Sequence, residues 1–226
     1  MIEEGLVIKS TGLWYKVQTP KALLDCRIRG KIRLQGMKST NPVAVGDRVL
    51  VEVSETEEGH GAITKLLDRK NYIIRKSVNL SKQTQILAAN VDQALLIATL
   101  DQPKTHLRFI DRFAVSAEAY DIPFVLVFNK TDLYTDAHFE ELEFLRIVYE
   151  QAGYTVMECS AQSGEGLEEL NSLLQSKISL LSGHSGVGKS SLINRIDPNL
   201  NLKTRAISEA HEQGQHTTTF AEMHPL

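Results

Sequence analysis

Short apolar runs separated by turn residues make up the first 68 residues of the chain. The runs are rich in Val, Ile, Leu and aromatic residues, and they lie at residues 6–10, 13–19, 22–30, 47–54 and 61–67. Glycine, proline and Asn or Asp residues stand between them, as expected of turns that join strands. Five short strands in about 65 residues predict an N-terminal all-β barrel of the OB-fold type, although composition alone also fits an SH3-like barrel.

The pattern changes at Asn90 to alternating strands and helices. Continuous apolar runs, typical of buried parallel strands, lie at residues 93–100, 123–129, 155–160 and 177–182. Helical periodicity follows these runs at residues 106–121, 136–153, 166–174 and 190–196. This alternation predicts an α/β domain with a doubly wound, mostly parallel sheet and helices on both faces.

The same pattern makes two finer predictions. The helix at 136–153 is expected to bury one apolar face, made of Phe139, Leu142, Leu145, Val148 and Tyr149. Residues 76–88 are polar without clear periodicity and are interpreted as a linker or mobile loop. The predicted organisation is an OB-fold domain at 1–75, a linker at 76–89 and an α/β domain at 90–226.

Composition places the chain among soluble globular proteins, with 42% hydrophobic and 23% charged residues. No apolar run approaches the ~18 residues that span a membrane, and the N-terminus lacks a basic-then-apolar leader. A cytoplasmic protein without a membrane partner is therefore expected. Two cysteines, Cys26 and Cys159, are too few for a disulfide framework or a zinc site and are expected to be reduced and half-buried.

Charge is distributed unevenly between the two predicted domains. Residues 1–75 carry 13 Lys and Arg against 9 Asp and Glu, whereas the remainder carries 12 against 19. Within residues 21–38 six basic residues face one acid, Asp25. A basic first domain suggests contact with a polyanion. Its aromatic residues Trp14 and Tyr15 suit base stacking, but packing in the barrel is the favoured interpretation.

A phosphate-binding motif lies at Gly183–Ser190, where the sequence fits G-x-x-x-x-G-K-[ST] between an apolar strand and a helix. Its glycines let backbone N–H groups surround phosphate oxygens, Lys189 reaches the β- and γ-phosphates, and Ser190 offers a hydroxyl to Mg²⁺. The predicted phosphate-site residues are Gly183, Ser185, Gly186, Val187, Gly188, Lys189, Ser190 and Ser191.

A guanine-reading set follows two other strands. In Asn129-Lys130-Thr131-Asp132 the Asp132 carboxylate accepts both the N1–H and the 2-amino donors of guanine, a pair that adenine lacks. The stem of Lys130 is expected to cover the base, and Asn129 to tie this loop to the phosphate loop. After the next strand, Ser160 and Ala161 belong to a Ser-Ala-Gln motif whose Ala161 N–H is expected to meet guanine O6.

Residues 214–219, Gly-Gln-His-Thr-Thr-Thr, suit a nucleotide switch, because a threonine hydroxyl there can sense Mg²⁺ and the γ-phosphate. Ordinary GTPases place the phosphate loop first and the N-K-x-D and S-A-K motifs after it. Here the base-reading motifs come first, which indicates a circular permutation and explains why the phosphate loop lies so late in the chain.

With these motifs in this order, the chain resembles the RsgA (YjeQ) family of small-ribosomal-subunit biogenesis GTPases. The resemblance covers the whole chain, from "GLVIKSTGLWYKV" and "CRIRGKIR" through "VFNKTDL" and "SAQSGEGL" to "GHSGVGKSSLIN" and "GQHTTT". It implies a cytoplasmic GTPase that binds the small subunit late in maturation and hydrolyses GTP faster there. It also implies help in the release of assembly factors, and a monomer is expected.

The resemblance also suggests site roles. Thr218 joins Ser190 as a predicted Mg²⁺ ligand by family register, and Lys189 stabilises the transferring phosphoryl group. No residue is a clear water-orienting glutamine; His216 is a candidate for the catalytic site, against a structural or solvated role. His184 is interpreted as a loop-surface residue. The residues predicted to contact the rRNA backbone are Arg27, Arg29, Lys31 and Arg33.

Two features of the family are missing from the sequence: the D-T-P-G motif and the Cys/His zinc domain that follow in the family. Residues 220–226, "FAEMHPL", are expected to form a strand of the α/β sheet whose neighbour is absent. The chain is therefore predicted to be a fragment with weak hydrolysis, and zinc is expected only in the absent domain.

Two other functions compete with a subunit-stimulated GTPase. One is a GTP-gated rRNA-binding module in which hydrolysis is incidental. The other is an adenine-nucleotide kinase or ATPase that shares only the phosphate loop, which the two guanine-reading motifs argue against.

Overall fold

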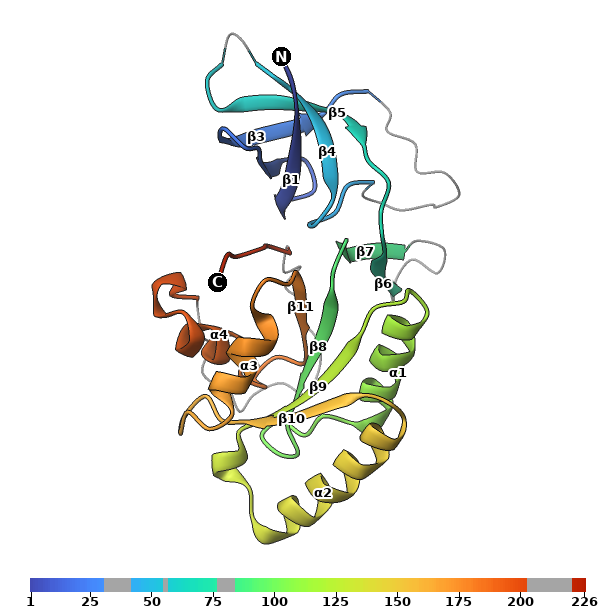
Figure 1. Cartoon of the computed structure of the whole chain (residues 1–226), viewed down its shortest axis with the longest axis vertical. Coiled ribbons are helices and arrows are strands. Elements are labelled where there is room, and N and C mark those ends of the chain that lie inside the picture. The colour runs from blue at the N-terminus through green and yellow to red at the C-terminus, as the bar shows by residue number, and fades with distance from the viewer. Residues whose placement is uncertain (31–41, 55–56, 77–83, 203–220) are drawn as a thin grey trace. The chain divides into compact units, whose positions relative to one another are not determined.

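The computed structural model describes residues 1–30, 42–54, 57–76, 84–202 and 221–226. The described residues divide into two compact units (Figure 1). One contains residues 1–91 with the described residues 221–225, and the other begins at Asp92.

A closed barrel forms most of the first unit. Its strands are β1 (Ile2–Ser10), β2 (Tyr15–Gln18), β3 (Leu23–Ile28), β4 (Arg48–Val53) and β5 (His60–Leu66). They pair in the order β1-β2-β3-β5-β4, with β4 closing onto β1, and β3–β5 is the parallel pair. Alternate side chains point inward and are fully or nearly buried, among them Val7, Val17, Cys26, Val51 and Ile63. This five-stranded arrangement confirms the predicted barrel and favours the OB-fold over the SH3-like alternative.

A two-stranded hairpin follows the barrel, where the sequence pattern had indicated a linker or mobile loop. β6 (Tyr72–Lys76) pairs antiparallel with β7 (Thr84–Ala89). The hairpin buries Ile73 and Ile86, and the backbone N–H of Ala89 donates to the Val45 carbonyl at 2.9 Å. The polar sequence of this segment did not predict strand β7. The strand is stabilised by pairing with β6 and by contact with the barrel, which a local sequence pattern does not report.

The second unit is built on a parallel four-stranded sheet. Its strands are β8 (Gln93–Ala98), β9 (Phe124–Asn129), β10 (Thr155–Cys159) and β11 (Ser179–Ser182), in the order β10-β9-β8-β11. The helices are α1 (Leu107–Glu118), α2 (Asp136–Gln151), α3 (Leu167–Leu174) and α4 (Lys189–Ile196), with 3₁₀ turns η1 (Thr131–Leu133) and η2 (Pro198–Leu200). The predicted α/β class and parallel sheet are confirmed.

Helices cover both faces of this sheet, as predicted (Figure 1). Leu95, Ile97, Val125 and Val127 pack with residues of α3 and α4 in one core cluster. On the other face α1 contacts β8 and β9. Helix α2 lies beside α1, and the two are joined by a hydrogen bond in which the Tyr149 hydroxyl donates to Asp111 Oδ1 at 2.8 Å. Since successive residues of a strand point to opposite faces, the unbroken apolar runs of β8 and β9 are what two covered faces require.

Helix α2 departs from its predicted burial. Leu142, Leu145 and Tyr149 are buried as expected, but Phe139 and Val148 are 45% and 43% exposed. The buried stripe of α2 is thus narrower than its apolar content suggested, because only one line of the helix reaches the sheet and α1. The remaining apolar residues face outward.

The described C-terminal residues, Ala221–Leu226, do not form the expected strand of the parallel sheet. Glu222 instead forms an isolated antiparallel bridge with Lys9 of β1, and the two side chains form an ion pair at 2.8 Å. The N–H of Met223 donates to the Ile8 carbonyl at 2.7 Å. Backbone groups of this segment are thus satisfied at the barrel.

Both cysteines are free and fully buried rather than half-buried. Burial raises the pKa of the Cys26 thiol to about 11 and that of Cys159 to about 12, so neither forms a reactive thiolate readily. Within the described ranges, every helix is too short or too polar to cross a lipid bilayer.

Candidate nucleotide-binding site

Three of the predicted nucleotide motifs lie in described loops that follow strands of the parallel sheet: Asn129 ends β9, Ser160 follows β10 and Gly183 follows β11. The loop of Asp101, which belongs to none of the predicted motifs, follows β8. The carboxyl ends of parallel strands meet at one edge of the sheet, which is where open α/β sheets bind ligands. The topology therefore brings four separate loops to one site.

The phosphate loop has the backbone geometry that its glycines predict. Gly183, Gly186 and Gly188 have positive φ angles of 144°, 86° and 94°. A β-carbon on Gly183 would lie 2.4 Å from the Ile97 carbonyl oxygen, and one on Gly188 would lie 2.3 Å from Asn129 Nδ2. Both positions thus need glycine for space as well as for backbone conformation. Between them Val187 is fully buried, whereas Ser185 is exposed.

Lys189 begins α4 and turns back over the loop. Its ammonium donates to the carbonyls of Gly183 at 2.8 Å and His184 at 2.7 Å. Burial lowers the pKa of this ammonium, since the half-buried charge has lost part of its water. A phosphate oxygen at the N-terminus of α4 would pair with it. Ser190 and Ser191, next along the helix, are half-buried beside this position.

Asn129 joins three of the loops. It is 1% exposed, and its Nδ2 donates to the Val187 carbonyl of the phosphate loop at 2.7 Å. Its Oδ1 accepts from the Ala161 N–H at 3.3 Å. The predicted tie between the guanine-reading loop and the phosphate loop is therefore present. Ala161 N–H, expected to meet guanine O6, is bonded to Asn129 instead.

Asp132 is held in place by the serine of the neighbouring loop. The Ser160 hydroxyl donates to Asp132 Oδ1, and it accepts from the N–H groups of Gln162 at 3.1 Å and Ser163 at 3.0 Å. The carboxylate itself is exposed, so its other oxygen remains accessible to a base. A fixed, accessible acceptor is what recognition of the guanine donors needs.

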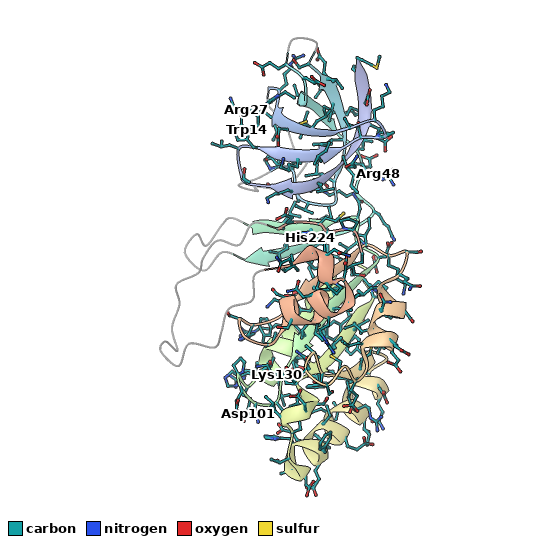
Figure 2. All side chains as sticks on the ribbon, turned by 90° about the vertical axis from the view of Figure 1, so that its left-hand side faces the viewer. Trp14, Arg27, Arg48, Asp101, Lys130 and His224 are labelled. Atoms are coloured by element: carbon teal, nitrogen blue, oxygen red, sulfur yellow. The ribbon has the colours of Figure 1, made fainter. Side chains whose placement is uncertain are left out.

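Lys130 reaches the loop that follows β8. It adopts a left-handed conformation, with φ 70°, and its ammonium donates to the Gln102 carbonyl. Burial lowers its pKa, and the carboxylates of Asp132 and Asp101 act in the opposite direction. Figure 2 shows Lys130 and Asp101 close together. The side chain is thereby held at the loop that follows β8.

Sequence reasoning missed Tyr134, which joins the loop after β8 to the loop after β9 by hydrogen bonds. Its hydroxyl donates to the Asn129 carbonyl at 3.1 Å and accepts from the Leu100 N–H at 3.0 Å. Burial raises its pKa from near 10 to about 12, so the phenol stays neutral and keeps its proton for Asn129. Its place two residues after Asp132 is the sole sequence signal, and that spacing alone does not reveal a contact with Leu100.

His184 is more enclosed than the predicted loop-surface role implies. Its ring lies edge-on to Phe109 of α1, with centroids 4.1 Å apart. Burial and the nearby charge of Lys189 lower its pKa. The phosphate loop therefore packs against α1 through this ring contact.

Several predicted site residues lie outside the described residues. These are His216, Thr218, Lys31 and Arg33. Among the residues that are described, no group of three His, Cys, Asp or Glu side chains is placed to hold a metal ion.

On the barrel, two of the predicted RNA-contacting residues have partners. The Arg27 guanidinium lies 3.9 Å above the centre of the Trp14 ring (Figure 2), and His60 meets the same ring edge-on at 6.2 Å. Arg29 pairs with Glu52. These residues line a groove of about 520 Å³. Tyr15 is 1% exposed and packs in the barrel, as favoured, whereas Trp14 is 37% exposed.

Comparison with known proteins places both units. Residues 66–226 match the sequence model described as RsgA GTPase, and residues 4–63 match the RsgA N-terminal domain. The chain is 51% identical over 224 residues to "Small ribosomal subunit biogenesis GTPase RsgA" of Flavobacterium psychrophilum, covering 98% of this chain and 69% of that protein. It is 53% identical over 225 residues to the protein of the same name from Christiangramia forsetii, covering 99% and 71%.

Two solved structures are similar as well. One is YjeQ from Thermotoga maritima, with a TM-score of 0.71 and 37% identity over 91% of this chain and 68% of that one. The other is YloQ, described as a circularly permuted GTPase, with a TM-score of 0.63 and 29% identity over 88% and 66%. The permuted motif order is thus shared with a solved structure.

Proposed function

Because the chain belongs to the RsgA GTPase family, a family of GTP-hydrolysing enzymes, we propose that it binds the small ribosomal subunit and assists its late maturation. On the subunit it hydrolyses GTP to GDP and phosphate faster than alone. The observation that carries the GTPase part is Asn129, which bonds the guanine-reading loop to the phosphate loop at 2.7 Å. The part concerning the subunit is supported by the names of the relatives and by the basic barrel.

Guanine is selected by Asp132. One carboxylate oxygen accepts from Ser160, which leaves the other free for the N1–H and 2-amino donors of the base. Lys130 covers the base from one side. Adenine in this position would leave the carboxylate without its donors, a cost of about 1–3 kcal/mol or more for a charged group.

The phosphates lie against the phosphate loop and the N-terminus of α4, with Lys189 as the positive charge. The residues present fit a Mg²⁺ ion, because a hard cation beside phosphates needs few protein oxygens and Ser190 supplies a hydroxyl there. When bound, Mg²⁺ neutralises charge on the β- and γ-phosphate oxygens. Thr218 is proposed as the second protein ligand.

Hydrolysis depends on positioning and on charge stabilisation. Lys189 and the loop N–H groups stabilise charge on the transferring phosphoryl group. His216, which lies outside the described residues, is proposed to hold the attacking water.

The barrel is proposed to contact rRNA through its groove beside Trp14. The outer face of the Arg27 guanidinium, stacked on Trp14, offers a flat cationic surface to an unpaired base. Arg29 can exchange its surface partner Glu52 for a phosphate at little cost, because exposed ion pairs contribute about 0–1 kcal/mol. Lys31 and Arg33 extend the proposed contact. In OB-folds the β1–β2 turn and the faces of strands 2 and 3 commonly bind nucleic acid.

The protein is further proposed to act in the cytoplasm as a monomer and to promote release of assembly factors. The test is GTP turnover with and without purified small subunits, with Lys189→Ala as the control that lacks the phosphate-site charge. Stimulation of the parent chain and its absence in the control support the proposal. Binding of GTP and of subunits without stimulated turnover would instead favour a GTP-gated rRNA-binding module.

A further inference from the structure

We propose that the outward face of α2 docks onto a basic segment of a protein of the small ribosomal subunit, an inference that rests on the proposed function. This α2 outer face is made of Asp136, Phe139, Glu140, Glu143, Phe144 and Ile147. It lies on one helix of the α/β unit, and at one end of it the Phe139 ring meets Tyr134 edge-on, with ring centroids 5.9 Å apart.

The α2 outer face exposes large apolar side chains. Phe144 is 65% exposed, and Phe139 and Ile147 are each 45% exposed. They line a shallow groove of about 630 Å³ on the helix surface. Scattered apolar residues are ordinary on protein surfaces, but two phenylalanines and an isoleucine grouped on one helix face mark an interaction surface.

The helix does not need these residues for its own stability. Its opposite face buries Leu142, Leu145 and Tyr149, and Thr135 with His138 forms a capping box at its N-terminus. An aromatic side chain that the fold does not bury contributes little to folding. The exposed Phe144 is therefore available to a partner.

Charge decides which kind of partner fits. Acidic residues alternate with the apolar ones, and neither Asp136 nor Glu140 forms an ion pair within the described part of the chain. Glu143 pairs with Arg146, the one cation of the helix. A surface of this sign repels RNA phosphates and repels a second copy of itself.

A basic amphipathic segment of protein satisfies both features. Its apolar residues cover Phe144 and Ile147, while Lys or Arg side chains pair with Asp136 and Glu140. Proteins that bind rRNA carry such cations because they neutralise phosphates. The barrel and the α2 outer face then engage the subunit through opposite chemistries, RNA for the basic surface and protein for the acidic one.

The first experiment compares binding to purified small subunits by the parent chain, Phe144→Glu and Val115→Glu. Val115 is the matched control, because it is 66% exposed on helix α1, almost the same as Phe144. Phe144→Glu is expected to weaken binding by about tenfold or more, with Val115→Glu within about twofold of the parent. GDP affinity should be equal in all three, which shows that the variants fold.

Equal subunit binding by Phe144→Glu and the parent would overturn the inference while leaving the proposed function standing. If the parent itself fails to bind subunits, the proposed function fails and the inference fails with it. Charge is tested separately with Glu140→Lys, which should also weaken binding, by about threefold or more. Unchanged binding by this variant would remove the basic partner from the proposal.

The second experiment identifies what lies against the helix. Because Cys26 and Cys159 are fully buried, a benzophenone maleimide will label an introduced Phe144→Cys selectively. After irradiation with small subunits, the crosslink is expected on a subunit protein, at a segment rich in Lys or Arg. The matched position is Glu169→Cys, exposed on α3. A crosslink from residue 144 to rRNA or to a second copy of the chain, or none beyond the Glu169→Cys level, contradicts the inference.

Discussion

At the scale of single residues, the proposed guanine preference rests on the Asp132 carboxylate. Asp132→Asn keeps the acceptor that Ser160 needs but replaces the second oxygen by an amide donor. The affinity for GTP is expected to fall by about 2–3 kcal/mol, roughly a hundredfold. Affinity for xanthosine triphosphate should rise, because its 2-oxo group accepts the new donor. Competition binding with the three nucleotides GTP, ATP and XTP measures both effects.

Asp121→Asn is the control for that substitution. Asp121 is exposed and has a left-handed backbone, φ 53°, that asparagine also adopts readily. It should bind GTP like the parent. Retained GTP preference in Asp132→Asn would place the guanine-reading group elsewhere.

Gly188 is a position where both the backbone conformation and the lack of space for a β-carbon require glycine. In Gly188→Ala the new methyl group would meet Asn129 Nδ2 at 2.3 Å, on a backbone with φ 94°. The clash separates the phosphate loop from the guanine-reading loop, so GTP affinity is expected to fall by at least about tenfold. Equilibrium nucleotide binding measures this loss.

Gly153→Ala separates strain from crowding. Gly153 has nearly the same φ, 91°, but nothing within 4 Å of its β-carbon position. This variant should lose only about 1–2 kcal/mol of unfolding free energy and should bind GTP normally. Equal loss of GTP binding in both variants would show that backbone strain, rather than the contact with Asn129, is responsible.

At the scale of elements, Tyr134 connects the loops that follow two different strands, β8 and β9. Tyr134→Phe removes the hydroxyl that bridges Asn129 and Leu100 and leaves a buried N–H without a partner. The α/β unit is expected to lose about 1–3 kcal/mol of unfolding free energy. Urea unfolding measured by a signal from this unit checks the loss, and an unchanged midpoint would contradict it.

The same tyrosine predicts an alkaline effect. Its pKa is raised to about 12 in the folded state, so the unfolded chain ionises first as the pH rises above 10. The stability contribution of Tyr134 is therefore complete below pH 10 and is lost as the pH approaches 12. The parent should lose more stability than Tyr134→Phe across this window. Parallel curves would show that the phenol is not protected in the fold.

Elements also show how far sequence patterns reach. The strands of the barrel and of the parallel sheet could be predicted from apolar runs and turn residues, because those patterns reflect local burial. The hairpin strands β6 and β7 could not, because each is stabilised by pairing with the other rather than marked by a local pattern. The burial of Phe139 and Val148 was predicted wrongly. Periodicity shows which side of a helix is apolar, but it does not show how much of that side the rest of the fold covers.

At the scale of the whole molecule, the salt dependence of binding distinguishes two kinds of contact proposed for the barrel surface, base stacking and phosphate pairing. Trp14→Ala should weaken small-subunit binding by about 1–3 kcal/mol with an unchanged salt slope, because stacking releases no counterions. Arg27→Ala should reduce the slope of the logarithm of affinity against the logarithm of salt by about one. Binding measured between about 50 and 200 mM salt gives both quantities.

Arg48→Ala is the matched control on the barrel. Arg48 is exposed, pairs with Glu4 and lies on the opposite side of the barrel from Trp14 and Arg27 (Figure 2). It should match the parent in affinity and slope. Equal slopes for the parent and Arg27→Ala would argue that the basic barrel surface faces solvent in the complex.

The sequence by itself determined the family and the two kinds of unit, and it predicted the guanine and phosphate motifs. These follow from local rules, because hydrophobic period, turn chemistry and motif spacing act over a few residues. Only the tertiary structure decided that Asn129 meets Val187, 58 residues away, that Arg27 stacks on Trp14, and that Glu222 and Met223 lie against β1. Such contacts depend on strand order and on which surfaces remain uncovered, and neither is written in any one stretch of the chain.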